Sequence, residues 1–310
     1  MNWNKESQQI IKGVDNANKL LGKEMMVEGS FPIKIPVEFF NLIDLTNPDD
    51  PLLKQVSPVI NEGEIQFKKD PLDDNQFSSI PGLIHKYKNR ALIISSKSCR
   101  IHCQYCFRKN FEYKVHDIFS NLEEIVSYLK SHIEIDEVIL SGGDPFTLSD
   151  EKLKKIIDPI NDIPHIKTIR FHTRTLVVIP DRIKSGFVDY LKGLRLNTVI
   201  VFHINHPNEI GSKFINFINE LEDFRLLNQS VLLKGVNDNP ETLKALSIKL
   251  FEIGVLPYYL HLLDEVEGSE HFFISEKDAK NIHKNLQKLV SGYLVPRLVK
   301  DENLESKTWK

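Results

Sequence analysis

Cysteine, tryptophan and long apolar runs are all scarce in this sequence. Its 310 residues include only three cysteines and two tryptophans. No apolar segment approaches the roughly 20 residues that a membrane-spanning helix needs, and the N-terminus lacks a charged region followed by an apolar signal core. Three cysteines without a disulfide framework are typical of a reducing compartment. We therefore expect a cytoplasmic protein.

An excess of charge is also missing. The formal net charge is −3, which gives no bulk attraction to nucleic acid or to a membrane surface. What the sequence does have is apolar material for a large core, since 41% of its residues are hydrophobic. For a chain of this length, one barrel-sized domain with appendages is the natural prediction.

The cysteines themselves are concentrated in one place. All three lie in the eight residues from Cys99 to Cys106, with the spacing C-x3-C-x2-C. Thiolates bind zinc or iron–sulfur clusters, and three of them can hold a 4Fe-4S cluster while one iron stays open to another ligand. A structural zinc would need a fourth protein ligand, for which His102 or a distant histidine is the candidate. Chance clustering of buried thiols is the third reading.

The first 89 residues are predicted to form an N-terminal extension of the barrel domain. Residues from about 4 to 22 have apolar positions at helical spacing, and Phe31 to Pro36 is predicted to be extended because each proline disfavours helix in the residue before it. The stretch from Asn47 to Pro81 is rich in Pro, Asp and Asn and is predicted to be mostly loop. No chemistry can be assigned to this extension from its residues alone.

From Arg90 onward, short β-branched runs alternate with helical patterns. The predicted strands are Ala91–Ile94, Glu137–Leu140, Thr168–Phe171, Thr198–Phe202, Ser230–Leu233 and Tyr258–Leu260. The predicted helices are Leu122–Leu129, Asp150–Ile157, Pro180–Leu191, Lys213–Leu221 and Glu241–Phe251. After a wider first gap the strands recur about every 30 residues, the length of one β/α unit. We predict a partial (β/α)6 barrel, with a doubly wound open sheet as the alternative, and ligands beyond the carboxyl ends of the strands.

The loop after the second predicted strand reads Ser141-Gly142-Gly143-Asp144-Pro145. Adjacent glycines let a backbone approach a ligand closely, and their amide and carbonyl groups can bind amino and carboxylate functions. A tight strand-to-helix turn with Asp144 near the helix start is an equally good reading of the loop by itself.

Together these motifs resemble a known family. The cysteine spacing followed by Phe107 resembles radical S-adenosylmethionine enzymes, and the Gly-Gly-Asp loop resembles the element that binds the methionine amino group of that cofactor. The chain is similar to lysine 2,3-aminomutases over nearly its whole length, most of all to those that make (R)-β-lysine for elongation factor P. The segments that carry this resemblance are Arg90, Cys106–Arg108, Leu140–Asp144, His206–Ile210, Gln229–Asn237, Pro257–Tyr259, His271–Phe272, Ser291–Pro296 and Glu305–Thr308.

The resemblance implies an isomerase that moves an amino group from C2 to C3 of lysine, using a 5'-deoxyadenosyl radical and a pyridoxal phosphate aldimine. Cys99, Cys103 and Cys106 would hold the 4Fe-4S cluster. Lys307 matches the lysine that binds pyridoxal phosphate, with Lys300 and Lys310 as less favoured alternatives.

Other matched positions concern the ligands. Arg90 matches the residue that binds the cofactor phosphate, and Arg108 the residue that pairs with the substrate carboxylate. Asp264 and Asp301 match two acids that hold the ε-ammonium of lysine, where two anions favour a cationic substrate end. Two further residues at strand ends, Gln229 and His203, are expected to contact the sugar or adenine of S-adenosylmethionine.

The family also implies an architecture and partners. We expect an N-terminal extension (1–89), a radical S-adenosylmethionine partial TIM-like barrel (90–274) and a C-terminal helix with the pyridoxal-phosphate lysine (275–310). A reductant such as flavodoxin or ferredoxin, and a pathway link to elongation factor P and its lysine ligase, would follow. The alternatives are another amino-acid 2,3-aminomutase, a radical enzyme without pyridoxal phosphate, and a non-catalytic zinc-binding module.

Overall fold

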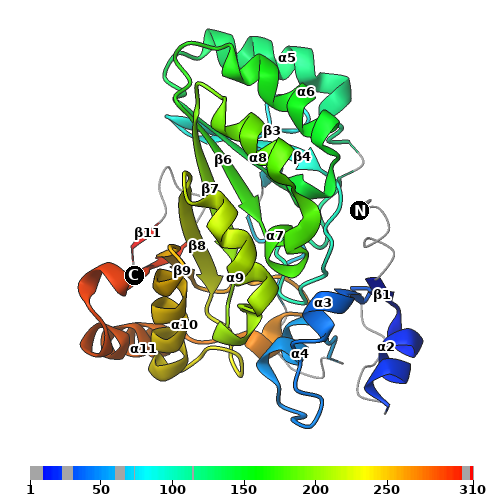
Figure 1. The fold of residues 1–310 in the computed structure, drawn as a ribbon, viewed down its shortest axis with the longest axis vertical. Coiled ribbons are helices and arrows are strands. Elements are labelled where there is room, and N and C mark those ends of the chain that lie inside the picture. Colours follow the sequence, from blue (N-terminus) through cyan, green and yellow to red (C-terminus); the bar gives the residue numbers. More distant parts are fainter. Residues whose placement is uncertain are drawn as a thin grey trace.

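The centre of the molecule is one nine-stranded sheet (Figure 1). A computed structural model describes residues 10–22, 31–59, 67–72, 74–113, 115–301 and 308–309. The sheet has the order β11-β10-β9-β8-β7-β6-β5-β4-β3. Its strands are β3 (Leu83–Tyr87), β4 (Arg90–Ser96), β5 (Glu137–Gly142), β6 (Thr168–Thr173), β7 (Asn197–His203), β8 (Arg225–Val231), β9 (Leu256–His261), β10 (Arg297–Lys300) and β11 (Thr308–Trp309).

The strand order distinguishes between the two predicted architectures. Strands β4 to β10 are parallel and follow one another in sequence order, and only the edge strands β3 and β11 pair antiparallel. A doubly wound sheet would reverse its strand order at a switch point. The singly wound order is that of a partial barrel, so the predicted fold class is confirmed and the open-sheet alternative is wrong. The predicted number of six strands is one too few, because β10, in the segment predicted to follow the barrel, pairs parallel with β9.

Helices cover the outer face of this sheet (Figure 1). They are α5 (Ile118–Ser131), α6 (Asp150–Asn161), α7 (Thr175–Val178), α8 (Ser185–Lys192), α9 (Ser212–Ile218), α10 (Pro240–Glu252) and α11 (Glu276–Leu289). Short polar residues begin four of them, because a side-chain oxygen accepts from the first free amides of the helix. These caps are Asp117 of α5, Ser149 of α6, Asn239 of α10 and Ser275 of α11.

Three predicted elements of the barrel differ from the structure. The predicted strand Ser230–Leu233 is instead Arg225–Val231, and Leu232 and Leu233 are buried in the loop that follows. The predicted helix Pro180–Leu191 is divided into a 3-10 turn, η3 (Pro180–Arg182), and α8. Lys213–Leu221 is likewise α9 followed by the 3-10 turn η5 (Asn219–Leu221). Other 3-10 turns are η1 (Asp74–Phe77), η2 (Pro145–Thr147), η4 (Pro207–Glu209), η6 (Glu270–Phe272) and η7 (Gly292–Leu294).

The N-terminal extension has more regular structure than its sequence predicts. It contains β1 (Ile10–Lys12), α2 (Val14–Leu21), β2 (Lys34–Pro36), α3 (Val37–Phe40) and α4 (Pro51–Val56). The predicted helix 4–22 is correct only over α2, since Ile10–Lys12 pairs with β2, and residues 1–9 lie outside the described residues. The predicted loop 47–81 contains α4. Asp50 caps this helix by accepting from the amides of Leu52 and Leu53, and Pro51 has the fixed φ that a first helical residue needs.

The extension shares its core with the barrel. Ile35, Phe39 and Leu52 belong to the same buried apolar cluster as Phe171 and Phe202. The predicted boundary at residue 89 therefore lies inside a continuous core, and the division into domains stays a prediction. Among the described residues, none of the helices has both the length and the hydropathy that crossing a membrane requires.

Candidate functional site

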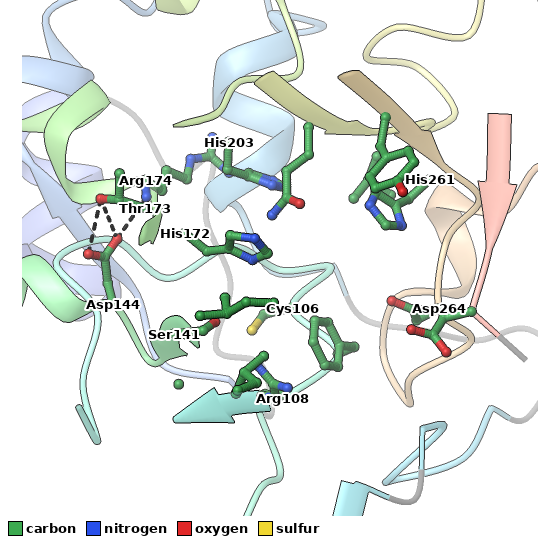
Figure 2. Close-up of a pocket in the computed structure, with 18 of the residues that line it drawn as sticks. Cys106, Arg108, Ser141, Asp144, His172, Thr173, Arg174, His203, His261 and Asp264 are labelled. Carbon is green, nitrogen blue, oxygen red and sulfur yellow. Dashed lines mark hydrogen bonds between the residues drawn. The ribbon is translucent and has the colours of Figure 1, made fainter. Parts of the chain in front are cut away.

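A cavity of about 530 Å³ lies inside the partial barrel. It is lined by the loops that follow the strands and by residues along the strands, as far as Arg90 and Glu137 at the amino ends of β4 and β5. Every residue predicted for the site lines this cavity, except Lys307, which lies outside the described residues. The predicted residues that line it are Arg90, Cys99, Cys103, Cys106, Arg108, Gly142, Gly143, Asp144, His203, Gln229, Asp264 and Asp301. In Figure 2, Asp144 and Arg174 lie at one end of the cavity, and His261 and Asp264 lie at the other.

The N-terminal extension holds the cysteine loop in place. The amide of His102 donates to the carbonyl of Lys34 at 2.9 Å, and the amide of Gln104 donates to the carbonyl of Gln55 at 2.9 Å. The Lys34 ammonium also donates to the carbonyl of Cys99. Because these bonds come from β2 and α4, the extension fixes the backbone of the cysteine loop. Sequence reasoning found no role for these residues.

The thiols suit a positively charged metal group. Each cysteine is partly buried and forms no disulfide. Burial raises the pKa of Cys99 well above its ordinary value, and nearby cysteines raise it further. Burial and the charge of Cys103 raise the pKa of Cys106 to about 11. An iron core would reverse this tendency, because its positive charge favours the thiolate form.

The zinc reading with His102 as fourth ligand does not fit. The His102 ring stacks on Phe31, with ring centroids 4.6 Å apart, and the contact of its Nδ1 with the carbonyl oxygen of Pro32, at 2.8 Å, leaves Nε2 as the nitrogen that could bind a metal. The position of the ring is what argues against zinc. His102 is not among the residues that line the cavity. Within the described part of the chain, no three His, Cys, Asp or Glu side chains are grouped so that they could hold a metal ion directly.

Both glycines of the Gly-Gly-Asp loop are required by the protein's own backbone. Gly142 has φ +111°, and a Cβ there would lie 2.7 Å from the carbonyl oxygen of Ser96. A Cβ on Gly143 would lie 2.2 Å from the carbonyl oxygen of Ser98. The amides of Gly143 and Asp144 donate to these same two carbonyls at 2.8 and 2.9 Å. Glycine thus allows this loop to approach the start of the cysteine loop closely.

Asp144 is a structural anchor of the same loop. Its side chain is buried and accepts hydrogen bonds from Thr173 Oγ1 at 3.0 Å and from the amide of Arg174 at 2.7 Å (Figure 2). The amides of Phe146 and Thr175 also donate to it, at 3.0 and 2.8 Å. Burial raises its pKa, and these bonds oppose that shift. Since the carboxylate and the amides of Gly143 and Asp144 are engaged with the protein, what this loop can offer a ligand is its backbone carbonyls.

Arg174, the residue directly after β6, was missed by sequence reasoning. Its side chain is buried. The guanidinium donates to Cys103 Sγ at 2.9 Å, to Glu209 at 3.0 Å and to Gln55 Oε1 at 2.9 Å, and it also donates to the hydroxyl of Tyr105. The available signal was a charged residue three positions after the predicted strand Thr168–Phe171, near the ligand-binding edge of a parallel sheet.

His203 belongs to the same network. It ends β7, its Nε2 lies 2.9 Å from the hydroxyl of Tyr105, and the two rings stack with centroids 5.7 Å apart. Burial and the neighbouring charge of Arg174 lower the pKa of His203 to about 3. The imidazole is therefore neutral at physiological pH, and one of its nitrogens is already engaged.

The opposite end of the cavity contains a buried ion pair. Lys86 of edge strand β3 pairs with Asp301, which directly follows β10, and the two side chains are only 6% and 16% exposed. These residues come from opposite sides of the strand order, so the pair joins the two sides of the partial barrel. Asp264 lies in the loop after β9 and lines the same cavity. Lys86 is a second residue that sequence reasoning missed.

Basic and aromatic side chains also line the cavity. The guanidinium of Arg90 lies 3.8 Å from the centre of the Tyr87 ring. The Tyr87 hydroxyl is buried without a hydrogen-bond partner, and burial, reinforced by the charge of Asp301, raises its pKa to about 12. Arg108 is buried, with its guanidinium 4.7 Å from the centre of the Phe107 ring. Gln229 is on β8 and also lines the cavity.

Comparison with known proteins gives consistent matches. A sequence model described as the Radical SAM superfamily matches residues 93–244. The chain is 46% identical to an L-lysine 2,3-aminomutase of Haemophilus influenzae, over 87% of this chain and 82% of that protein. It is 40% identical to an L-lysine 2,3-aminomutase of Escherichia coli, over 96% and 91%. A solved structure of anSMEcpe with bound AdoMet aligns with a TM-score of 0.48 and 14% identity, over 64% of this chain and 56% of that chain.

Proposed function

This chain belongs to the lysine 2,3-aminomutase family of radical S-adenosylmethionine enzymes, and we propose that it converts L-lysine to β-lysine. The observation that supports this most is the shared cavity, which brings the cysteine loop, the Gly-Gly-Asp loop, two arginines and two distal acids together. We propose the R form of β-lysine as the product and elongation factor P as its destination. The support for these two points is the resemblance of the Glu305–Thr308 segment to that branch.

At one end of the cavity, Cys99, Cys103 and Cys106 would hold a 4Fe-4S cluster through their thiolates. When bound, the cluster supplies the single electron that cleaves S-adenosylmethionine. The backbone carbonyls of Gly142 and Gly143 would accept from the methionine amino group of this cofactor, because a carbonyl oxygen has two lone pairs and the close packing of the two glycines on Ser96 and Ser98 fixes their backbone.

Two residues of β7 and β8 would receive the nucleoside of that cofactor. Gln229 can offer both a donor and an acceptor to the sugar or adenine. The neutral His203 would offer the ring face that Tyr105 does not cover, since its Nε2 and one face are occupied by Tyr105. Gln229 and His203 line the same cavity as the cysteine loop, so a nucleoside held by them would share this space with the cluster.

Pyridoxal phosphate fits the part of the cavity that Tyr87 and Arg90 line. The buried Tyr87 hydroxyl lacks a partner, and Arg90 lies against its ring, so an anionic phosphate would find a donor and a positive charge together. Lys307 would bind the cofactor carbonyl, and the bound cofactor supplies the conjugated group that carries the migrating nitrogen. The chain's own task there is to hold the phosphate and exclude water.

Lysine would be recognised at its two charged ends. The Arg108 guanidinium suits the α-carboxylate, because a planar fork of donors matches two carboxylate oxygens. Asp264 and Asp301 would hold the ε-ammonium, and two anions at that point disfavour an acidic substrate. Asp301 already pairs with Lys86, so the substrate ammonium would share this acid with a protein lysine.

Anaerobic reconstitution tests the proposal. The purified protein is loaded with iron and sulfide, supplied with S-adenosylmethionine, pyridoxal phosphate, L-lysine and reduced flavodoxin or ferredoxin, and the products are separated by chiral chromatography. We expect β-lysine in the R form, together with cleavage of S-adenosylmethionine. Cleavage without amino migration would favour a radical enzyme independent of pyridoxal phosphate, and preferred turnover of glutamate would favour another aminomutase branch.

The destination of the product needs a separate assay. Elongation factor P is incubated with its lysine ligase, ATP and either the enzymatic product or L-lysine, and the mass of the modified factor is measured. We expect the enzymatic product to be attached more efficiently. Equal attachment of both amino acids would contradict the proposed pathway link while leaving the aminomutase activity untouched.

A further inference from the structure

Arg174 contacts Cys103, one of the three proposed cluster ligands, through its guanidinium. Its guanidinium donates to Cys103 Sγ at 2.9 Å, from the loop after β6. Its side chain is 7% exposed, so water screens its charge poorly. A permanent positive charge and an N–H group are therefore both directed at one of the three sulfur atoms.

A second set of contacts fixes this arginine. Glu209 accepts from the guanidinium at 3.0 Å and is itself completely buried, with 0% of its side chain exposed. Gln55 Oε1 accepts from the same nitrogen at 2.9 Å, and the amide of Asn205 donates to that oxygen at 3.0 Å. Lysine could not make these contacts at the same time, because its single ammonium lacks the planar fork of donors.

The contact between Arg174 and Cys103 should affect the reduction potential of a bound cluster. Reduction adds one electron and makes the cluster more negative, as [4Fe-4S]²⁺ becomes [4Fe-4S]⁺. A hydrogen bond to a ligand sulfur and a nearby cation stabilise the more negative state more than the less negative one. Both effects raise the reduction potential, and both are strong where little water is present.

We propose that Arg174 is a positioning residue that raises the reduction potential of the cluster through Cys103, and that Glu209 and Gln55 hold it in place. This inference rests on the proposed role of the three cysteines. It also gives the N-terminal extension a part in the chemistry, because Gln55 belongs to α4. The extension supports the cluster electrostatically as well as through the backbone of the cysteine loop.

The test is a redox titration of the reconstituted enzyme without S-adenosylmethionine. Dithionite supplies the electrons, and the reduced cluster is measured by electron paramagnetic resonance. For Arg174→Gln we expect about a tenfold lower ratio of reduced to oxidised cluster at a fixed potential, which is a shift of about 59 mV to more negative values for one electron. Arg174→Lys keeps the charge but not the fork, so its potential should lie between those of Arg174→Gln and the unmodified enzyme.

Arg182→Gln is the matched control. Arg182 is another buried arginine, and it is 2% exposed, but its partners are the carbonyls of Phe146 and Leu148 and the carboxylate of Asp150. Its loss should reduce the stability of the fold. It should shift the reduction potential of the cluster by only a small fraction of the shift in Arg174→Gln. An equal shift in both variants would mean that any buried arginine has this effect, which overturns the proposal.

Iron and sulfide analysis accompanies each titration. An unchanged potential in Arg174→Gln with a full cluster overturns the proposal, as does a change that occurs only after S-adenosylmethionine is added, which would make Arg174 a ligand of that cofactor. Loss of the cluster in both Arg174 variants would overturn it in favour of a role in assembly. If Cys103→Ala instead keeps an unaltered cluster, the cysteine assignment itself fails, and that result is separate from those for Arg174.

Discussion

At the scale of single residues, the side chains with the clearest motif are not always those that face a ligand. Asp144 completes the Gly-Gly-Asp motif, yet its carboxylate accepts several hydrogen bonds from the protein. Arg174 has no motif, yet it contacts a cysteine sulfur. A carboxylate that is buried must be satisfied by nearby donors, and the nearest donors here include the amides after β6.

The lysine of the C-terminal segment can be tested separately from the cluster. Lys307→Ala should lose the visible absorption of lysine-bound pyridoxal phosphate and keep the iron–sulfur spectrum, because its amine serves only the first cofactor. Lys300→Ala and Lys310→Ala are matched controls that should retain both spectra. Loss of the pyridoxal phosphate absorption in a control, with retention in Lys307→Ala, would show that the wrong lysine was chosen.

Substrate choice is tested at the distal acids. A hydrogen bond to a charged group contributes about 1.5 to 3 kcal/mol, and a tenfold change corresponds to about 1.4 kcal/mol. Asp264→Asn and Asp301→Asn should therefore each lower kcat/KM for lysine by about 10- to 100-fold.

Norleucine, which lacks the ammonium, provides the control for these two variants. It should be a poor substrate for the unmodified enzyme and should lose far less activity than lysine when either acid is changed. Equal losses for both substrates would mean that the acids act on folding or on a cofactor. Asp264→Asn is the cleaner variant, because Asp301 also neutralises Lys86.

At the scale of elements, the partial barrel is closed by side chains where backbone pairing stops. Strand β3 is one edge of the sheet, and β10 pairs with only the short β11 on its outer side. The Lys86–Asp301 pair joins these two sides, although 215 residues separate its members. Two extended segments that cannot share a hydrogen-bond ladder can thus still be held by one buried ion pair.

Breaking this pair should destabilise the fold. Lys86→Met keeps the apolar stem and leaves the Asp301 carboxylate buried without its cation, which typically costs about 3 to 5 kcal/mol. We expect a lower urea midpoint, and partial recovery in the double variant Lys86→Met/Asp301→Asn. Lys280→Met is the control, because it breaks an exposed pair with Glu276 of the kind that contributes about 1 kcal/mol or less. Similar losses in both single variants would contradict a special role for the buried pair.

At the scale of the whole molecule, stability should depend on pH through buried histidine. Both ring nitrogens of His271 are buried without a hydrogen-bond partner, and burial lowers its pKa to about 4 from an ordinary value of 6.5. Below pH 6.5 the unfolded chain therefore binds a proton that the folded protein does not bind until about pH 4. The folded state loses stability as the pH falls through this window.

The size of this effect has an upper limit of about 1.4 kcal/mol per pH unit for one proton. His271→Phe removes the titrating ring and should make the urea midpoint fall less steeply between pH 6.5 and 4. His165→Phe serves as the comparison for the loss of a histidine ring, because the His165 ring is only partly buried and is hydrogen-bonded to the carbonyl of Leu129. A slope that is the same in His271→Phe and the unmodified protein would mean that other groups control acid stability.

The sequence by itself determined the parts of this protein that depend on neighbouring residues. The spacing of Cys99, Cys103 and Cys106 predicted a metal-binding loop, and the alternation of apolar runs predicted the parallel strands, because both patterns are local. The ends of the strands were predicted less accurately than their existence. Leu232 and Leu233 look like strand residues, but they are buried in a loop because the core extends beyond the end of β8.

Only the tertiary structure decided which distant residues support the site. Gln55, Arg174 and Glu209 meet beside Cys103 from separate parts of the chain, and Lys86 meets Asp301 across the barrel. No local pattern encodes such contacts, because a buried charge is satisfied by whichever partner the fold brings within hydrogen-bond distance. The motif loops could therefore be recognised in the sequence. The residues that support these loops could be recognised only in the tertiary structure, because the fold brings them together from distant parts of the chain.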